Sequence, residues 1–290
     1  MSISESKPLI NQNPVLQSYY ASLESRIGYR FLLGGTRHFG YYDTDTLWQR
    51  WWPFPITKAL RRMEDYMFET LNLPTGATVL DAGCGYGLVA IHMANRGLNV
   101  RGIDIVDRHI ARARRNIRAA GLDKAIMIQK ADYHRLEEFE TDSLDGIYTM
   151  ETLVHATDVK SVLEGFHRVL KPGGSLVLFE YAHFTSNDSE STKLFDQVNV
   201  YAAMPANAKF EANTLRSLVE EIGFEDVQTR NLSEHVKPML RLFYAFAYFP
   251  YLFVRLFGLE KYFINIVAAI VAYRYYDQHQ YVAIRATKPL

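Results

Sequence analysis

A short glycine-rich segment is the part of the sequence best suited to bind a nucleoside. Residues 79–87 read Val-Leu-Asp-Ala-Gly-Cys-Gly-Tyr-Gly, so an apolar run ends at Asp81 and continues into glycines at alternate positions. Glycine is needed where the chain turns sharply and its backbone approaches a ligand that a Cβ atom would hit. Asp104 ends the next apolar run and lies 21 positions after Gly83 (104 − 83). That spacing is typical of the acid that binds ribose hydroxyls in a Rossmann unit.

A second group of polar residues could manage a proton. Glu151 and His155 are four positions apart, and Glu180 and His183 follow another apolar run. Ligands of open α/β sheets lie at the carboxyl ends of strands, so we expect both pairs to face one pocket. Apolar neighbours would raise the pKa of Glu180 if it is buried, which favours a role as a base. For His155, a purely hydrogen-bonded structural role is the open alternative.

The elements that must position these residues alternate along the chain. Strands are expected at 78–82, 99–105, 125–131, 145–150, 175–181, 225–231 and 281–285, and helices at 86–96, 107–120, 158–170 and 212–222. This alternation predicts an α/β fold with a doubly wound, mostly parallel sheet that is covered by helices on both faces.

The form Asp-x-Gly-x-Gly-x-Gly resembles motif I of the class I S-adenosylmethionine-dependent methyltransferases and differs from the Gly-x-Gly-x-x-Gly of NAD enzymes. Further matches to that family follow in order, in Ala131-Asp132-Tyr133 and in the segments 144–151 and 170–174. The resemblance implies a Rossmann-like seven-stranded sheet whose last strand is antiparallel. It also implies S-adenosylmethionine (SAM) as the cofactor and S-adenosylhomocysteine as its product.

The same resemblance implies the cofactor-binding residues. In the family, the acid after the third strand meets the adenine amino group, which points to Asp132. The segments 18–20 and 38–43 resemble the cap of sterol C-methyltransferases and tocopherol-type methyltransferases, in which a tyrosine like Tyr20 lies near the sulfonium. The pairing of Glu151 with His155 also resembles the sterol enzymes. The implied cofactor-binding set is Tyr20, Asp81, Gly83, Cys84, Gly85, Gly87, Asp104, Ile105, Asp132, Tyr133 and Met150.

Two apolar segments frame this core. Residues 14–75 are interpreted as an aromatic-rich cap behind a polar, flexible tail at 1–13. Residues 234–279 form an apolar helical insertion between the core at 76–233 and the last strand at 280–290, where the fold usually has a short hairpin. Its charge-free runs are too short for a transmembrane helix. Three interpretations stay open: buried core helices, a lid over an apolar acceptor pocket, and an interfacial membrane surface.

Composition excludes several functions. Basic and acidic residues both number 32 among 290, so no long-range field attracts nucleic acid. The single cysteine, Cys84, cannot form a disulfide framework and fits a reducing, cytoplasmic compartment. No residue pattern predicts a metal site. Peripheral membrane contact through residues 239–276 and a homo-oligomer both stay open.

These features predict an enzyme that transfers a methyl group from SAM to a hydrophobic small molecule such as a terpenoid, sterol or prenylated aromatic compound. Carbon as the acceptor atom is implied by the resemblance. Glu151, His155 or Glu180, with His183 as a further candidate, would handle the proton. The alternatives are an O- or N-methyltransferase of the same fold, a SAM-binding regulatory protein, and a SAM-binding fold with a changed reaction, such as cyclisation coupled to or replacing methylation.

Overall fold

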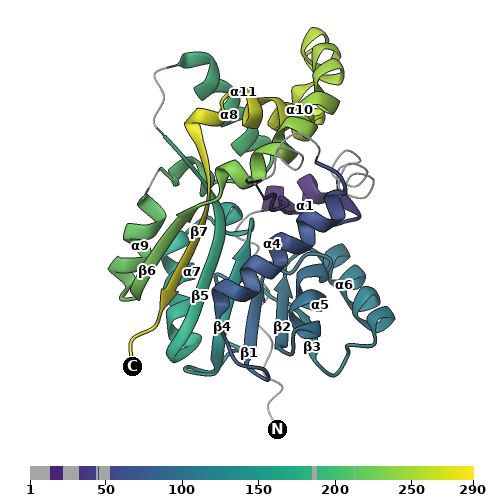
Figure 1. The fold of residues 1–290 in the computed structure, drawn as a ribbon. Helices are drawn as coiled ribbons and strands as arrows, with labels where there is room; N and C mark the ends of the chain where they lie inside the picture. Colours follow the sequence, from purple (N-terminus) through teal and green to yellow (C-terminus); the bar gives the residue numbers. More distant parts are fainter. Residues whose placement is uncertain (1–13, 22–32, 44, 46–52, 185–187, 212) are drawn as a thin grey trace, which may run out of the picture.

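A computed structural model describes residues 14–21, 33–43, 45, 53–184, 188–211 and 213–290. Figure 1 shows a central twisted sheet with helices on both sides and a group of helices at one end. The predicted tail at 1–13 and the predicted cap residues Tyr29, Phe31, Trp48, Trp51 and Trp52 lie outside the described residues.

The sheet has seven strands in the order β3-β2-β1-β4-β5-β7-β6. The strands are β1 (Thr78–Ala82), β2 (Asn99–Asp104), β3 (Ile126–Lys130), β4 (Leu144–Met150), β5 (Leu170–His183), β6 (Glu225–Asn231) and β7 (His279–Thr287). Strands β1 to β5 run parallel to one another, whereas β7 runs antiparallel between β5 and β6. The predicted Rossmann-like sheet with an antiparallel last strand is therefore confirmed.

Helices cover both faces of the sheet. They are α1 (Pro14–Ala21), α4 (Ile56–Leu71), α5 (Leu88–Asn95), α6 (Asp107–Ala120), α7 (Val159–Val169), α8 (Ser189–Tyr201), α9 (Thr214–Ile222), α10 (Ser233–Leu256) and α11 (Ile264–Arg274), with short 3-10 turns such as η1 (Leu153–His155) and η3 (Glu260–Tyr262). Buried residues of α4, α5 and α6 pack in one apolar cluster, and those of α7 and α9 pack in another. Because both faces are covered, β4 and β5 are apolar along most of their length.

Helix α4 corrects the predicted boundary of the cap. It lies inside residues 14–75, yet Met63, Met67 and Leu71 are fully buried in the cluster that covers the sheet. Its apolar positions follow a helical period, and that period is the same whether a helix covers a core or a cap. The described cap therefore consists of α1 and residues 33–43, and α4 belongs to the core.

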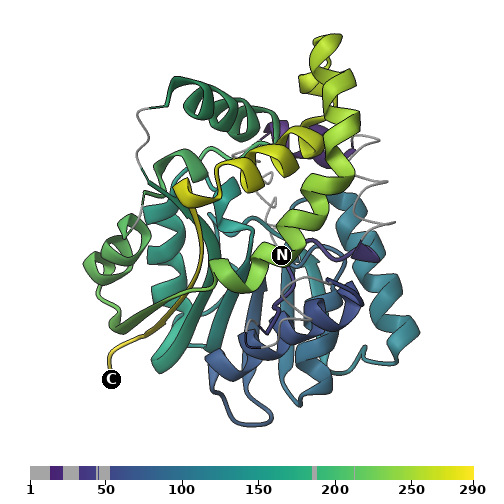
Figure 2. The ribbon, with the colours of Figure 1, turned by 45° about the horizontal axis from the view of Figure 1, so that its top comes forward.

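The insertion is helical, as predicted, and takes part in a layer of helices that we call the roof: α1, residues 33–43, α8, α10 and α11. Val236 and Leu240 in the first turns of α10 pack into the core, while Ile270 of α11 shares a buried cluster with Leu16 of α1 and Val198 of α8. Figure 2 shows α11 between α8 and α10, and the far end of α10 rises beyond the rest of the ribbon. The roof lies at the carboxyl end of β2, where Gln17 of α1 donates to the carbonyl of Ile105 at 3.4 Å.

Candidate functional site

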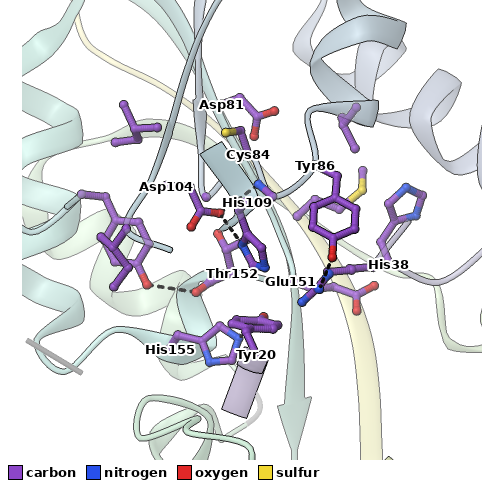
Figure 3. Close-up of a pocket in the computed structure, with 18 of the residues that line it drawn as sticks. Tyr20, His38, Asp81, Cys84, Tyr86, Asp104, His109, Glu151, Thr152 and His155 are labelled. Carbon is purple, nitrogen blue, oxygen red and sulfur yellow. Dashed lines mark hydrogen bonds and ion pairs between the residues drawn. The ribbon is translucent and has the colours of Figure 1, made fainter. Parts of the chain in front are cut away.

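A pocket lies at the carboxyl ends of β1, β2 and β4, beneath the cap (Figure 3). Its wall combines the glycine loop after β1, the residues that follow β2, β3 and β4, and cap residues from α1 and positions 35–38. Most of the predicted site residues line it: Tyr20, Asp81, Gly83, Cys84, Gly85, Asp104, Ile105, Asp132, Tyr133, Met150, Glu151 and His155. Topology brings them together because the carboxyl ends of parallel strands meet at one edge of the sheet.

The sequence has glycine at Gly83 and Gly85 for different physical reasons. Gly83 has φ +95°, and a Cβ there would lie 2.7 Å from the side chain of Thr152, so close packing requires glycine. Gly85 has φ +53°, and a Cβ there would meet nothing within 4 Å, so the loop leaves room for a ligand beside it. Gly87 begins α5, where a Cβ would approach Ala113 at 3.2 Å, and it lies outside the pocket lining.

Asp104 anchors the loop to the end of β2. Its Oδ2 accepts from the backbone N–H of Gly85 and from Nδ1 of His109, both at 3.0 Å, and its Oδ1 accepts from the N–H of Val106 at 2.8 Å. Burial would raise the pKa of Asp104, but the charge and hydrogen bond of His109 and the two backbone donors together lower it. The side chain is therefore an ionised, oriented acceptor at the pocket wall.

The pocket fits SAM by the chemistry of its donors and acceptors. Asp81 and Asp132 line it, and in each the buried carboxylate oxygen Oδ2 has no hydrogen-bond partner among the described residues. Burial raises the pKa of Asp81 to about 7. SAM carries ammonium, adenine amino and ribose hydroxyl groups, which are the donors that such acceptors lack. Asp81, Asp104 and Asp132 would hold these groups, and the aromatic face of Tyr20 suits a sulfonium cation.

Arg37 is a lining residue that the sequence analysis did not identify. Its guanidinium carbon lies 4.4 Å from the ring centroid of Tyr20 and 4.9 Å from that of Tyr86, and Nη2 donates to the Tyr86 hydroxyl at 3.4 Å. Two aromatic faces thus hold a permanent positive charge at the pocket wall. Arg37 directly precedes the segment 38–43 that carried the resemblance in the cap, and this adjacency was the available signal.

Other lining residues were also missed. Tyr86, His109, Thr152 and His134 line the pocket without having been predicted. Tyr86 is a variable position of the glycine motif, and His109 contacts Asp104 from α6. Neither the motif nor the helical period marks these residues, because their contacts depend on how α6 packs against the loop.

Glu151 joins the cap to the sheet. Its Oε1 accepts from the N–H of Phe39 at 2.7 Å and from the hydroxyl of Tyr281 at 2.9 Å, and its Oε2 accepts from the hydroxyl of Tyr181. Burial raises the pKa of Glu151, although these hydrogen bonds and the positive charge of His38 oppose the shift. Both oxygens are thus engaged by donors from the cap, β5 and β7. Its role in proton transfer stays a prediction, and the geometry shows a carboxylate that joins the cap to β5 and β7.

His155 is engaged at both ring nitrogens. Its Nδ1 lies 2.8 Å from the carbonyl oxygen of Ala203, which can only accept, so Nδ1 carries the proton. Its Nε2 then accepts from the hydroxyl of Tyr20 at 2.9 Å, and Figure 3 shows the two side chains beside each other. Burial lowers the pKa of His155 to about 4, so the ring is neutral at neutral pH. The Tyr20–His155 pair therefore fixes α1 to the pocket wall.

Glu180 and His183 lie outside the pocket lining. Oε1 of Glu180 accepts from the hydroxyl of Thr149 and from the N–H groups of Thr152 and Leu153, at 2.8–3.1 Å. Burial raises the pKa of Glu180 to about 8. The carboxyl group therefore stabilises the turn between β4 and η1 by accepting from its backbone N–H groups. His183 contacts Phe195 of α8 with its ring. Both residues end up behind the pocket because β5 extends past the ends of β1 and β4.

The insertion reaches the pocket only through other elements. Among the residues that the structure describes, none in 234–279 lines the pocket. Instead, Phe243 packs against Phe39 of the cap, and Asn265 accepts from the hydroxyl of Tyr19 at 2.7 Å. The cap therefore lies between the insertion and this pocket, and the expectation that the insertion walls the acceptor pocket stays a prediction.

Comparison with known proteins agrees with this geometry. The family model described as a methyltransferase domain matches residues 80–178. The S-adenosyl-L-methionine-dependent Diels-Alderase of Talaromyces variabilis is 41% identical over 280 residues, which is 94% of each chain. The chain belongs to the class I S-adenosylmethionine-dependent methyltransferase family. It is an enzyme of that fold, and SAM is its cofactor.

Two further relatives show the range of the family. The sterol 24-C-methyltransferase of Saccharomyces cerevisiae is 25% identical over 80% of this chain and 58% of its own. The crystal structure of the (4+2)-cyclase SpnF superposes with a TM-score of 0.73 and 22% identity over 98% of both chains. The second likeness confirms the fold.

Proposed function

We propose that the enzyme catalyses an intramolecular (4+2) cycloaddition of an apolar polyene while SAM is bound. The observation that carries this proposal is the 41% identity with a SAM-dependent Diels-Alderase over nearly the whole of both chains. The aligned region spans the cap and the insertion as well as the cofactor-binding core. The likeness therefore supports the alternative of a changed reaction better than the methyl transfer favoured by the sequence analysis.

The pocket supports this choice because its candidate bases are already engaged. Glu151 accepts three hydrogen bonds, and both nitrogens of His155 have partners. Methylation of a hydroxyl or amine needs an acceptor for the departing proton. A cycloaddition needs none, because two carbon–carbon σ bonds form from π electrons and every atom of the substrate stays in the product.

To accelerate a cycloaddition, the protein must hold the substrate in a conformation that brings its two reacting groups together, and it must stabilise the charge that develops in the transition state. Tyr20, Tyr86 and Tyr133 line the pocket, and a polyene could lie beside their rings. Arg37 would donate to a carbonyl oxygen conjugated with the dienophile and withdraw electron density from it. When bound, SAM supplies a second fixed positive charge. Both charges act in a largely buried pocket, where electrostatic effects are stronger than in water.

The test uses linear polyenes that carry a diene and a carbonyl-conjugated alkene on one chain. The protein with SAM should convert such a substrate into a single diastereomer of unchanged mass, and faster than buffer does. Removal of SAM should slow the reaction. A mixture of diastereomers at the uncatalysed rate, with and without SAM, would contradict the proposal.

Methyl transfer to carbon of an apolar acceptor is the second candidate. The intact cofactor site and the likeness to the Saccharomyces sterol enzyme favour it. Attack by an alkene on the methyl group would leave a carbocation, which the faces of Tyr20 and Tyr86 could stabilise. A product heavier by one methyl group would establish this reaction in place of the first.

A further inference from the structure

We infer that the far end of the α10–α11 hairpin binds the surface of an anionic lipid bilayer. This inference is independent of the proposed reaction. It rests on a group of apolar side chains that we call the tip patch: Phe249, Leu252, Phe253, Leu256, Phe257 and Tyr262. These residues are 48–77% exposed, although side chains of this kind are normally buried.

The tip patch occupies one side of a helix whose other side is packed. Phe249, Phe253 and Leu256 recur at spacings of three and four residues, which places them on one face of α10. Ala247, Tyr251 and Val254 alternate with them and are buried in the cluster shared with α11. The apolar surface therefore exceeds what packing within the chain requires. Figure 2 shows this end of α10 projecting from the body of the protein.

The charges around the patch favour an anionic surface. Residues 241–274 contain four basic residues, Arg241, Arg255, Lys261 and Arg274, and one acidic residue, Glu260, whereas the whole chain is neutral. Arg255 and Lys261 flank the patch and are exposed, and Arg255 also lies 3.7 Å from Glu190 of α8 in an exposed ion pair. Nζ of Lys261 lies 4.8 Å from the ring centroid of Tyr262. Basic residues beside exposed aromatic and leucine side chains are typical of interfacial membrane helices.

The geometry fits contact with a bilayer rather than passage through it. Among the described helices, α10 alone is long and apolar enough to cross a membrane, judged by length and composition only. Its first half, however, packs into the protein through Val236, Met239 and Leu240. Only the second half is available to lipid. A narrow projecting end also offers little area to a flat protein surface, whereas it can enter the headgroup region of a bilayer.

Flotation with lipid vesicles tests this inference. The full chain should float with vesicles of phosphatidylcholine and phosphatidylserine, and less with phosphatidylcholine alone. The double variant Phe253→Asp/Leu256→Asp should reduce the bound fraction about tenfold or more, because two apolar anchors are lost. Arg255→Glu/Lys261→Glu should reduce binding to the anionic vesicles only. Met127→Asp, at an exposed apolar residue of β3, is the matched control and should bind like the unaltered protein.

Thermal unfolding and SAM binding of each variant show that it is folded. Absence of flotation on every vesicle composition would overturn the inference. A dimer at the same protein concentration that the tip variants dissociate would assign the patch to a second copy instead. Membrane association that resists an alkaline wash would indicate a spanning helix and would equally overturn it.

Discussion

The sheet core and the roof of this protein differ in how they are held together. In the core, backbone hydrogen bonds and buried packing fix the glycine loop: the N–H groups of Gly83 and Cys84 donate to the carbonyl of Ile103 in β2, and Gly83 packs against Thr152. The cap is joined to the core mainly through side chains, as where Glu151 accepts from the N–H of Phe39 and His155 from the hydroxyl of Tyr20, with a few backbone bonds such as Tyr41 N–H to the carbonyl of Ala59. The core supplies most residues of the cofactor pocket, and in the proposed reaction the cap would shape the space in which the substrate reacts. A cofactor motif thus identifies the cofactor more reliably than it identifies the reaction.

Asp104→Ala tests the core and should have the largest effect. It removes an ionised acceptor and also the anchor of the Gly85 N–H. We expect SAM binding to weaken by about 1–3 kcal/mol, or roughly tenfold to a hundredfold in Kd. Calorimetry measures this directly. Asp107→Ala is the control, since Asp107 forms only an exposed pair with Lys130, and equal affinities of the two variants would contradict the assignment.

Arg37→Met tests the cap as the region that governs the reaction. Loss of a charged donor should slow turnover by about tenfold to a hundredfold. The Kd for SAM should change much less, because Asp81, Asp104 and Asp132 remain. Steady-state kinetics and calorimetry on one protein sample separate the two effects. Arg62→Met, which removes a guanidinium outside the pocket near Tyr41, serves as the control. A parallel loss of SAM affinity would move Arg37 to the cofactor site.

Variants of Glu151 distinguish a structural role, in which its carboxylate joins the cap to the sheet, from a role as a base. Glu151→Ala leaves three donors unsatisfied and should destabilise the protein by about 2–3 kcal/mol. Hydrogen exchange in residues 33–43 should become several-fold faster. Glu151→Gln keeps an acceptor oxygen and should retain most of the activity. If the glutamine variant instead lost all activity while exchange in the cap stayed unchanged, a role as a base would follow.

Glu180→Gln should have the smallest effect on activity and a measurable effect on stability. Burial raises the pKa of Glu180 to about 8, above the value in the unfolded chain. The folded state thus holds a proton that the unfolded state releases, and stability declines as the pH rises from about 4.5 to 8. Glutamine does not ionise, so the variant does not lose this stability as the pH rises. The variant should gain stability relative to the unaltered protein by about 1–3 kcal/mol at pH 8 and far less at pH 5, as urea unfolding would show. An equal difference at both pH values would contradict the assigned protonation.

The sequence analysis anticipated most of the fold because the relevant signals are local. Each strand and helix of the core shows its period, and the glycine loop with Asp104 specified the cofactor. Helix α4 was not predicted, because residues 14–75 were interpreted as a cap from their aromatic content, and composition does not reveal which surface a segment covers. Arg37 was missed because it enters the site through packing against the distant Tyr86, and His109 was missed because no motif marks the first turn of α6. Glu180 could not be distinguished from a pocket residue, since the side chain of a strand end turns according to the loop beside it.

The most direct test of the proposed function follows the methyl group. The purified enzyme is incubated with SAM labelled with deuterium in its methyl group and with a linear polyene, and both product and cofactor are analysed by mass spectrometry. We expect a cyclic isomer of the substrate without label and SAM recovered intact after many turnovers. A product that carries the deuterated methyl group, formed together with an equal amount of S-adenosylhomocysteine, would contradict the proposal and establish a methyltransferase.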